Sequence, residues 1–198
     1  MNKYGAEKEP FMFIVDFDMK RPEIHKLNSV PPGIKFLTPL LSNVYPGQIY
    51  TKPVYFKKHP VPFSIYSEAF RNVQKNISLG NSYLLNLTFP TLIETEMTLE
   101  EIFEVSVAKY KLLYYNSFVV FSPEIFVRIK EGENSERGWY TGVFGVFDGK
   151  SLDSAVMIRF IEKDLDKLFY KSGGGITYLS DPVKEYEELI SKVYVPVG

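Results

Sequence analysis

The chain has no cysteine and only two histidines, His25 and His59, among its 198 residues. Without cysteine it can form no disulfide, and it offers neither a thiolate nucleophile nor a sulfur ligand for zinc. Both histidines stand close to prolines, a context that does not favour a histidine metal site. These absences exclude cysteine catalysis, disulfide-stabilised folds and cysteine-ligated metal centres.

The chain also lacks a charge excess and a long apolar run. Its 23 basic residues nearly cancel its 24 acidic residues, so no field of one sign attracts nucleic acid or an anionic membrane. The run "FMFIV" at residues 11–15 is too short for a signal peptide or a membrane span, and Asp16 and Asp18 follow it. We therefore expect a cytoplasmic protein that binds neither nucleic acid nor membrane.

What the chain does contain is enough apolar side chain for a packed core. Hydrophobic residues make up 45% of the sequence and aromatic residues 16%, which suits a single globular domain of this length. Ile65, Ala69, Val73 and Ile77 recur every four residues and predict an amphipathic helix, with Ser64 as its cap and Gly80 as its end.

The remaining patterns are mostly those of β-strands. A Ser/Thr-x-x-Glu capping box at Thr98–Glu101 predicts a helix to about Lys109, and Asp181 before Pro182 predicts the start of another. Residues 28–62 are rich in proline and glycine and predict a long irregular loop. Alternating or aromatic segments predict strands over 11–17, 82–90, 111–129 and 138–147, and a hairpin over 152–179 that turns at 162–167. The pattern predicts an α+β fold dominated by antiparallel strands.

The segment "GGGITYLSDPVKEYEE", residues 173–188, has the most informative chemistry. Three glycines let backbone N–H groups approach a carboxylate or phosphate, while Glu185 and Glu188 share one helix face and could hold Mg²⁺. The structural alternative is that the glycines only turn the chain and that the helix dipole alone favours the acidic residues.

Three further side chains are candidates for chemistry. Arg159 lies in an apolar stretch predicted to be a strand, where its guanidinium could bind a carboxylate or its stem could simply cover apolar surface. Glu124, at a corner formed by Pro123, could act as a general acid or could face water. Tyr140 could donate a hydrogen bond to a ligand or fill the core.

Together these residues resemble the chorismate-utilising enzymes, and most closely the aminodeoxychorismate synthase component I (para-aminobenzoate synthase component I) branch. The resemblance follows the family order over nearly the whole chain. It runs through "GNSYLLNLTFP", "FSPEIF", "RGWYTGVFG", "IRFIE" and "SGGGITYLSDPVKEYEELISKVY". It implies a shortened version of the family's α/β/β/α sandwich, with antiparallel sheets and helices packed outside.

The resemblance also implies roles for the candidate residues. Glu124 matches the glutamate that protonates the leaving hydroxyl of chorismate, and Tyr140 and Arg159 match residues that hold its carboxylates and polar groups. The remaining matches are the backbone that cradles a carboxylate, at Gly174 and Gly175, and the magnesium-binding glutamates, at Glu185 and Glu188. The implied cofactor is Mg²⁺.

The turn "EGENSE", residues 131–136, departs from the family pattern. There the family has a Pro-Ile/Met-Lys-Gly-Thr segment with the lysine nucleophile, and a long central region with another Mg²⁺-binding glutamate. We interpret the turn as a seam in one truncated domain, with residues 1–130 as its N-terminal part and 137–198 as its C-terminal part. Gly132 and Asn134 also predict that residues 126–147 form a hairpin across the seam.

The resemblance implies a transferase reaction in para-aminobenzoate and folate biosynthesis. Chorismate and ammonia from a glutamine amidotransferase subunit would give 4-amino-4-deoxychorismate. Because the lysine nucleophile segment is missing, we expect chorismate binding with negligible turnover. The alternative is a non-catalytic homologue that binds a small carboxylate or the amidotransferase subunit.

Overall fold

The computed structural model describes residues 1–44, 55–122 and 139–197. The chain divides into two compact units, each built from segments distant in sequence. The first unit comprises Met1–Lys52, Met97–Phe160 and Pro196–Gly198, and the second comprises Pro53–Glu96 and Ile161–Val195. The prediction of a single domain with a seam at 131–136 stays a prediction, because the seam lies outside the described residues.

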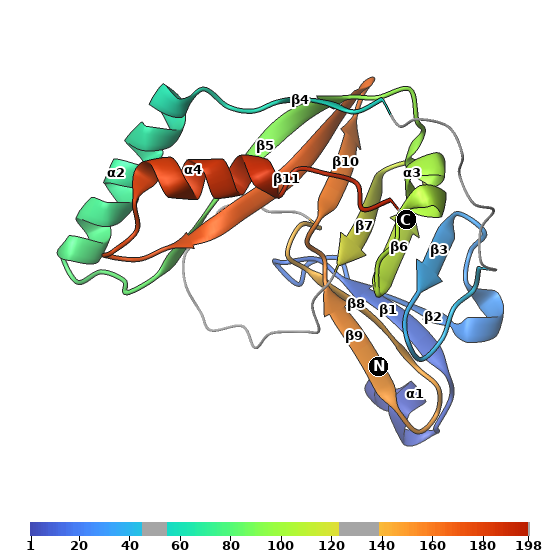
Figure 1. The fold of residues 1–198 in the computed structure, drawn as a ribbon. Helices are drawn as coiled ribbons and strands as arrows, with labels where there is room; N and C mark the ends of the chain where they lie inside the picture. The colour runs from blue at the N-terminus through green and yellow to red at the C-terminus, as the bar shows by residue number, and fades with distance from the viewer. Residues whose placement is uncertain (45–54, 123–138, 198) are drawn as a thin grey trace. The chain divides into compact units, whose positions relative to one another are not determined.

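The first unit contains a four-stranded antiparallel sheet (Figure 1). Its order is β2-β1-β8-β9, and a short helix α1 (Asn2–Ala6) precedes it. The strands are β1 (Phe11–Val15), β2 (Glu23–Lys26), β8 (Val143–Phe147) and β9 (Leu152–Val156). The strand predicted over 11–17 is therefore confirmed as β1.

Three further strands of the first unit form an antiparallel set in the order β3-β6-β7. They are β3 (Ile34–Leu37), β6 (Tyr110–Tyr114) and β7 (Phe118–Ser122), accompanied by α3 (Leu99–Val105) and a 3-10 turn η1 (Leu27–Ser29). Apolar side chains of both strand sets are buried together, including Met12, Ile14, Phe36, Leu112, Phe144 and Val146. This shared burial forms the core of the first unit.

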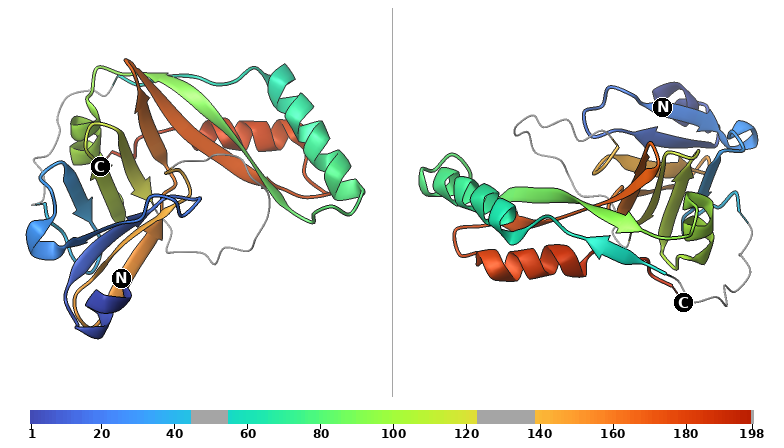
Figure 2. Two further views of the ribbon diagram at one scale, coloured as in Figure 1. Left: turned by 180° about the vertical axis from the view of Figure 1, so that it is seen from behind. Right: turned by 90° about the horizontal axis from the view of Figure 1, so that it is seen from above.

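The second unit is a strand set in the order β10-β11-β5-β4 with two helices against it. Its elements are β4 (Lys57–His59), α2 (Phe63–Ser78), β5 (Leu85–Glu94), β10 (Phe160–Asp164), β11 (Lys167–Ile176) and α4 (Pro182–Ser191). Figure 2 shows α2 and α4 beside the long β5–β11 ladder. Side chains of both helices and both strands meet in one core, which includes Tyr66, Phe70, Ile176 and Leu189.

The prediction of an α+β fold with antiparallel sheets is confirmed. The capping box is present, since Thr98 accepts a hydrogen bond from the Glu101 N–H and the Glu101 side chain accepts one from the Thr98 N–H. The N-cap of α4 is also as predicted, because Asp181 accepts from the N–H groups of Val183 and Lys184. The hairpin predicted within 152–179 is formed by β10 and β11, with Leu165 at its turn.

Several details predicted from local patterns are wrong. The irregular segment 28–62 contains strands β3 and β4, which are formed by pairing with β6 and β5 rather than by local sequence. Helix α3 ends at Val105 rather than near Lys109. The cap of α2 is Pro62 rather than Ser64.

The buried face of α2 is only partly the predicted one: Val73 and Ile77 are buried as predicted, but the first two positions are not Ile65 and Ala69. Tyr66, Phe70, Val73 and Ile77 are buried, whereas Ile65 is 52% exposed. The larger aromatic side chains fill the space above the ladder, because they bury more apolar surface than Ile65 and Ala69 would.

The hairpin predicted over 126–147 falls mostly outside the described residues. Its described end, Val143–Phe147, pairs on one edge with β1 and on the other with β9. No described helix is both long and apolar enough to cross a bilayer.

Candidate functional site

Glu185 and Glu188 of α4 both face Gly174 of β11. A Cβ atom placed on Gly174 would lie 3.3 Å from Glu185 Oε2 and 4.0 Å from Glu188 Oε1. Asp181 fixes where α4 begins, and the three-residue spacing then puts both side chains on one face of the helix. We call Glu185 and Glu188 the carboxylate pair.

The glycines that the pair faces lie in a strand, as the hairpin predicted over 152–179 implies, and not in the turn given as the structural alternative. Gly173, Gly174 and Gly175 belong to β11 and pair with residues 86–88 of β5 in a continuous antiparallel ladder. A Cβ atom on Gly173 would lie 2.4 Å from Thr88 Cγ2 and 2.6 Å from the Leu87 carbonyl oxygen. The glycines therefore allow close approach of β5 on one side and of the carboxylate pair on the other.

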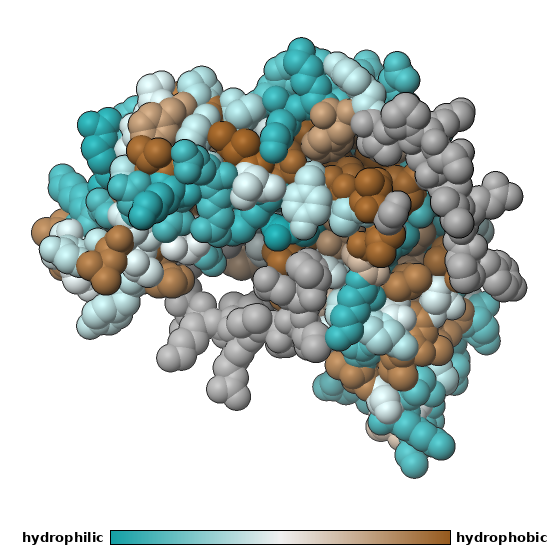
Figure 3. Space-filling view, viewed as in Figure 1, coloured by the Kyte–Doolittle hydropathy of each residue, from teal (hydrophilic) through white to brown (hydrophobic). Residues whose placement is uncertain are grey.

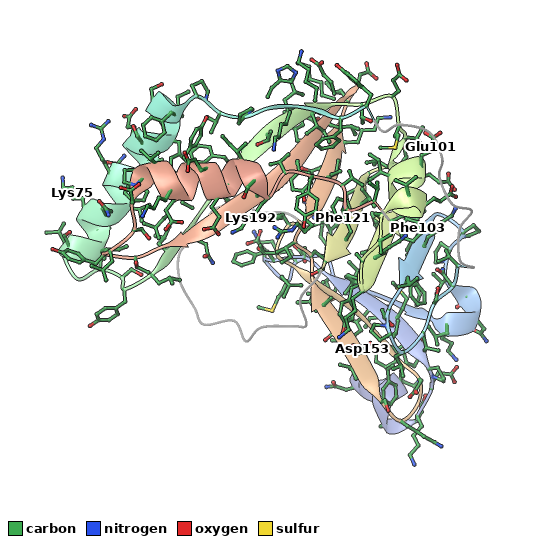
Figure 4. The ribbon with its side chains drawn as sticks, viewed as in Figure 1. Lys75, Glu101, Phe103, Phe121, Asp153 and Lys192 are labelled. Carbon is green, nitrogen blue, oxygen red and sulfur yellow. The ribbon has the colours of Figure 1, made fainter. Side chains whose placement is uncertain are left out.

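Lys192 completes this group of charges, and sequence reasoning did not identify it. Its ammonium Nζ lies 2.6 Å from Glu188 Oε1 and donates a hydrogen bond of 2.9 Å to the Gly173 carbonyl oxygen. Figure 4 shows Lys192 beside β11 at the C-terminal end of α4. The four-residue spacing from Glu188 is the sequence signal that could have indicated the ion pair.

Tyr66 of α2 lies in the apolar core of the second unit and contacts Tyr186 of α4, the helix that carries the carboxylate pair. Its ring lies 5.2 Å from that of Tyr186 and 5.7 Å from that of Phe89, and its side chain is almost fully buried. Burial raises the pKa of Tyr66 to about 12, and the negative charges of Glu185 and Glu188 add to the effect. The negative charges of the carboxylate pair therefore favour the protonated form of the Tyr66 hydroxyl, which stays protonated at neutral pH.

The donor set of this region fits Mg²⁺ better than a transition metal. Mg²⁺ binds through one or two carboxylates and completes its shell with water and substrate oxygens. Among the residues that the structure describes, no cluster of three or more His, Asp or Glu side chains could hold a metal ion. The Lys192 ammonium neutralises part of the negative charge of the carboxylate pair, and the negative charge that remains attracts a cation.

The other predicted site residues lie elsewhere in the chain. Glu124 lies outside the described residues. Tyr140 is buried in the core of the first unit, 6.0 Å from the Phe160 ring. Gly175 pairs with Asn86 in the ladder.

Arg159 is not in a strand, so its predicted place in one is wrong. It occupies a bend between β9 and β10 with a positive φ of 54°, and its carbonyl oxygen accepts a hydrogen bond from the Phe121 N–H. Arg159 and Tyr140 belong to the first unit, whereas the glycines and the carboxylate pair belong to the second.

Comparison with known proteins identifies the family. Residues 128–197 match the family model described as chorismate binding enzyme. An "Uncharacterized PabA-like protein" of Haemophilus influenzae is 31% identical over 314 aligned positions, which cover 99% of this chain and 95% of that protein. The chain belongs to the chorismate-binding enzyme family. PabA-like protein PM1464 of Pasteurella multocida gives the same identity and 97% coverage of its own length.

More distant family members match in sequence over a shorter region and in fold over most of the chain. Anthranilate synthase component 1 of Saccharomyces cerevisiae is 36% identical over 67 residues, 33% of this chain and 13% of that protein. The menaquinone-specific isochorismate synthase MenF of Escherichia coli matches with a TM-score of 0.61 at 10% identity, over 96% of this chain and 78% of that one. The fold is therefore that of chorismate-utilising enzymes.

The alignments also show how this family member differs in length from its relatives. The 314 positions aligned with the Haemophilus influenzae protein exceed the 198 residues of this chain by more than a hundred. This chain therefore lacks more than a hundred residues that the relative contains. That the missing residues belong between 131 and 136 stays a prediction.

Proposed function

We propose that this chain is a homologue of aminodeoxychorismate synthase component I that binds chorismate with Mg²⁺ and has lost turnover. The observation that carries the proposal is the carboxylate pair, which faces Gly174 from one side of α4. Family membership supports chorismate as the ligand. Figure 3 shows mostly hydrophilic residues, with some hydrophobic ones, in the region of α4.

In this proposal the second unit contains the cation site. Glu185 and Glu188 would hold Mg²⁺, which when bound would neutralise a carboxylate of chorismate. Gly174 has no side chain, so the strand can lie close to the carboxylate pair and leave room above it for the ligand. Gly175 is proposed to hold a further polar group of chorismate, and the roles that the resemblance implies for Tyr140 and Arg159 stay predictions.

Loss of turnover follows from the residues that are absent. Glu124, proposed as the general acid for the departing hydroxyl, has no lysine nucleophile to assist it. General acid catalysis alone supplies only about 10²–10⁴-fold acceleration. Ammonia from a glutamine amidotransferase subunit would then find no activated intermediate to attack.

The test is an incubation of the purified chain with chorismate, Mg²⁺ and ammonium, with products identified by mass. We expect no aminodeoxychorismate above the protein-free control. Chorismate binding measured by calorimetry should require Mg²⁺, should be lost in Glu188→Gln, and should persist in Glu187→Gln, which alters an exposed neighbour on the same helix. Ammonia-dependent conversion of chorismate would contradict the loss of turnover.

A second candidate function is a non-catalytic module that binds a small carboxylate or the amidotransferase subunit. The absence of more than a hundred residues found in the relatives favours this candidate over an active enzyme. Binding of benzoate or succinate as tightly as chorismate would support it, because a chorismate site discriminates against ligands that lack the enolpyruvyl group.

A further inference from the structure

Lys192 holds one member of the carboxylate pair in a defined position. It is the C-cap residue of α4, and its backbone N–H donates to the Glu188 carbonyl oxygen. Its side chain reaches back one turn, so that Nζ contacts both Glu188 Oε1 and the Gly173 carbonyl oxygen. The side chain of Lys192 is 25% exposed and that of Glu188 is 52% exposed. The ion pair therefore joins the helix to the strand at the edge of the proposed site.

Glu185 differs from Glu188 in this respect. Within the part of the chain that the structure describes, Glu185 forms no salt bridge, although its Oε2 lies on the same side of Gly174. Among the described residues, Lys192 therefore pairs with Glu188 and not with Glu185. A net negative charge remains on the pair, and a second cation would be attracted to it.

We propose that Lys192 is a tethered cation that holds Glu188 in the absence of Mg²⁺ and leaves Glu188 when Mg²⁺ binds. The inference rests on the proposed function, because it takes the carboxylate pair as the Mg²⁺ ligands. Lys192 is a positioning residue in this scheme. It weakens Mg²⁺ binding by competition and keeps the side chain of Glu188 directed at Gly174.

The competition follows from the distances. Mg²⁺ coordinates carboxylate oxygens at about 2.0–2.1 Å, which is closer than the ammonium lies to Glu188 Oε1. An ammonium on the same carboxylate would stand within a few ångströms of the dication, where repulsion between the two charges is strong. The flexible stem of lysine permits withdrawal. The Gly173 carbonyl oxygen then remains available as a hydrogen-bond acceptor for the displaced ammonium.

A purely structural role for Lys192 would have a different consequence. A lysine in the last turn of a helix also stabilises the negative end of the helix dipole. If that were its only role, its removal would lower the thermal stability of the chain without changing its Mg²⁺ affinity. Mg²⁺ affinity therefore separates the two roles.

The experiment titrates MgCl₂ alone into the full chain by isothermal titration calorimetry. We expect Lys192→Met to bind Mg²⁺ about two- to five-fold more tightly than the wild type, a change typical of partly exposed ion pairs. Lys192→Arg keeps the charge and should bind as the wild type does. Circular dichroism establishes that each variant is folded.

Lys75→Met is the matched control. Lys75 also lies in the last turn of a helix of the second unit, and Figure 4 shows it on α2, away from Lys192. Its removal changes the net charge by the same amount, so it should leave Mg²⁺ affinity unchanged. A gain equal to that of Lys192→Met would overturn the inference, because it would reflect net charge alone.

Two other outcomes contradict different parts of the argument. If the wild type binds Mg²⁺ and Lys192→Met binds it equally or more weakly, competition by Lys192 is overturned while the metal site stands. If Glu188→Gln binds Mg²⁺ as the wild type does, or if no variant binds it, the proposed site fails and the inference fails with it.

Discussion

Gly173 shows how a residue with no side chain sets the geometry of the proposed site. A Cβ atom there would overlap Thr88 Cγ2 and the backbone carbonyl oxygen of Leu87, at 2.4 Å and 2.6 Å. The backbone atom cannot move without disturbing the β5–β11 ladder. Packing against β5 therefore fixes the position of Gly173, which directly precedes Gly174, the residue that the carboxylate pair faces.

We expect Gly173→Ala to lower the free energy of unfolding by about 1–3 kcal/mol, the usual cost of overpacking. Urea denaturation followed by circular dichroism measures the change. Gly5→Ala is the control, because Gly5 lies in α1 with no atom within 4 Å of the added methyl group. It should be neutral or slightly stabilising, and equal losses in both variants would contradict the packing argument.

Tyr110 is a second residue whose environment has a measurable consequence. Its hydroxyl donates a hydrogen bond of 2.8 Å to Asp153 Oδ1, and the side chain is almost fully buried. Burial raises the pKa of Tyr110 to about 12, with further contributions from the hydrogen bond and the charge of Asp153.

Because the folded pKa of Tyr110 lies above its unfolded value of 10.0, its contribution to stability is complete below pH 10 and is lost as pH rises toward 12. We expect Tyr110→Phe to cost about 1–2 kcal/mol at pH 8. The difference from the wild type should shrink at pH 11. Urea denaturation of both proteins at the two pH values measures it, and a pH-independent difference would contradict the assignment.

At the scale of elements, α4 is the part of the fold on which the site depends. Asp181 Oδ1 accepts hydrogen bonds of 3.0 Å from the N–H groups of Val183 and Lys184, and Pro182 occupies the first helical position. These contacts fix where the helix begins. The direction in which Glu185 and Glu188 project follows from that starting point.

We expect Asp181→Ala to destabilise the chain by about 0.5–2 kcal/mol and to weaken Mg²⁺ binding, because fraying of the first turn releases Glu185. Thermal denaturation and calorimetry measure the two effects. Asp181→Asn can still accept the capping bonds and should keep most of both. If Asp181→Ala lost stability but not Mg²⁺ affinity, the first turn would not position the site.

At the scale of the whole molecule, the family fold is present over most of the chain although many residues of its relatives are missing. The chain matches MenF over 96% of its own length, although it lacks more than a hundred residues that its PabA-like relatives contain. Both units keep buried apolar cores among the described residues. A family fold can thus be largely present where many residues of a relative are not, because the buried core depends on only part of the sequence.

The sequence by itself determined the features that depend on neighbouring residues. Thr98 with Glu101, and Asp181 with Pro182, identify two helix starts because capping hydrogen bonds span only two or three residues. The spacing of Glu185 and Glu188 places them on one helix face for the same local reason.

Only the tertiary structure decided the features that depend on distant partners. The hairpin pattern predicts a strand through Gly173–Gly175, but the pairing of this strand with β5 is not specified by any local pattern. The sequence predicts a strand through Arg159, but β9 ends at Val156 and β10 begins at Phe160, so Arg159 lies in the bend between them. The contact between Lys192 and Gly173 crosses from helix to strand, and no local pattern specifies it because the packing of α4 on β11 creates it.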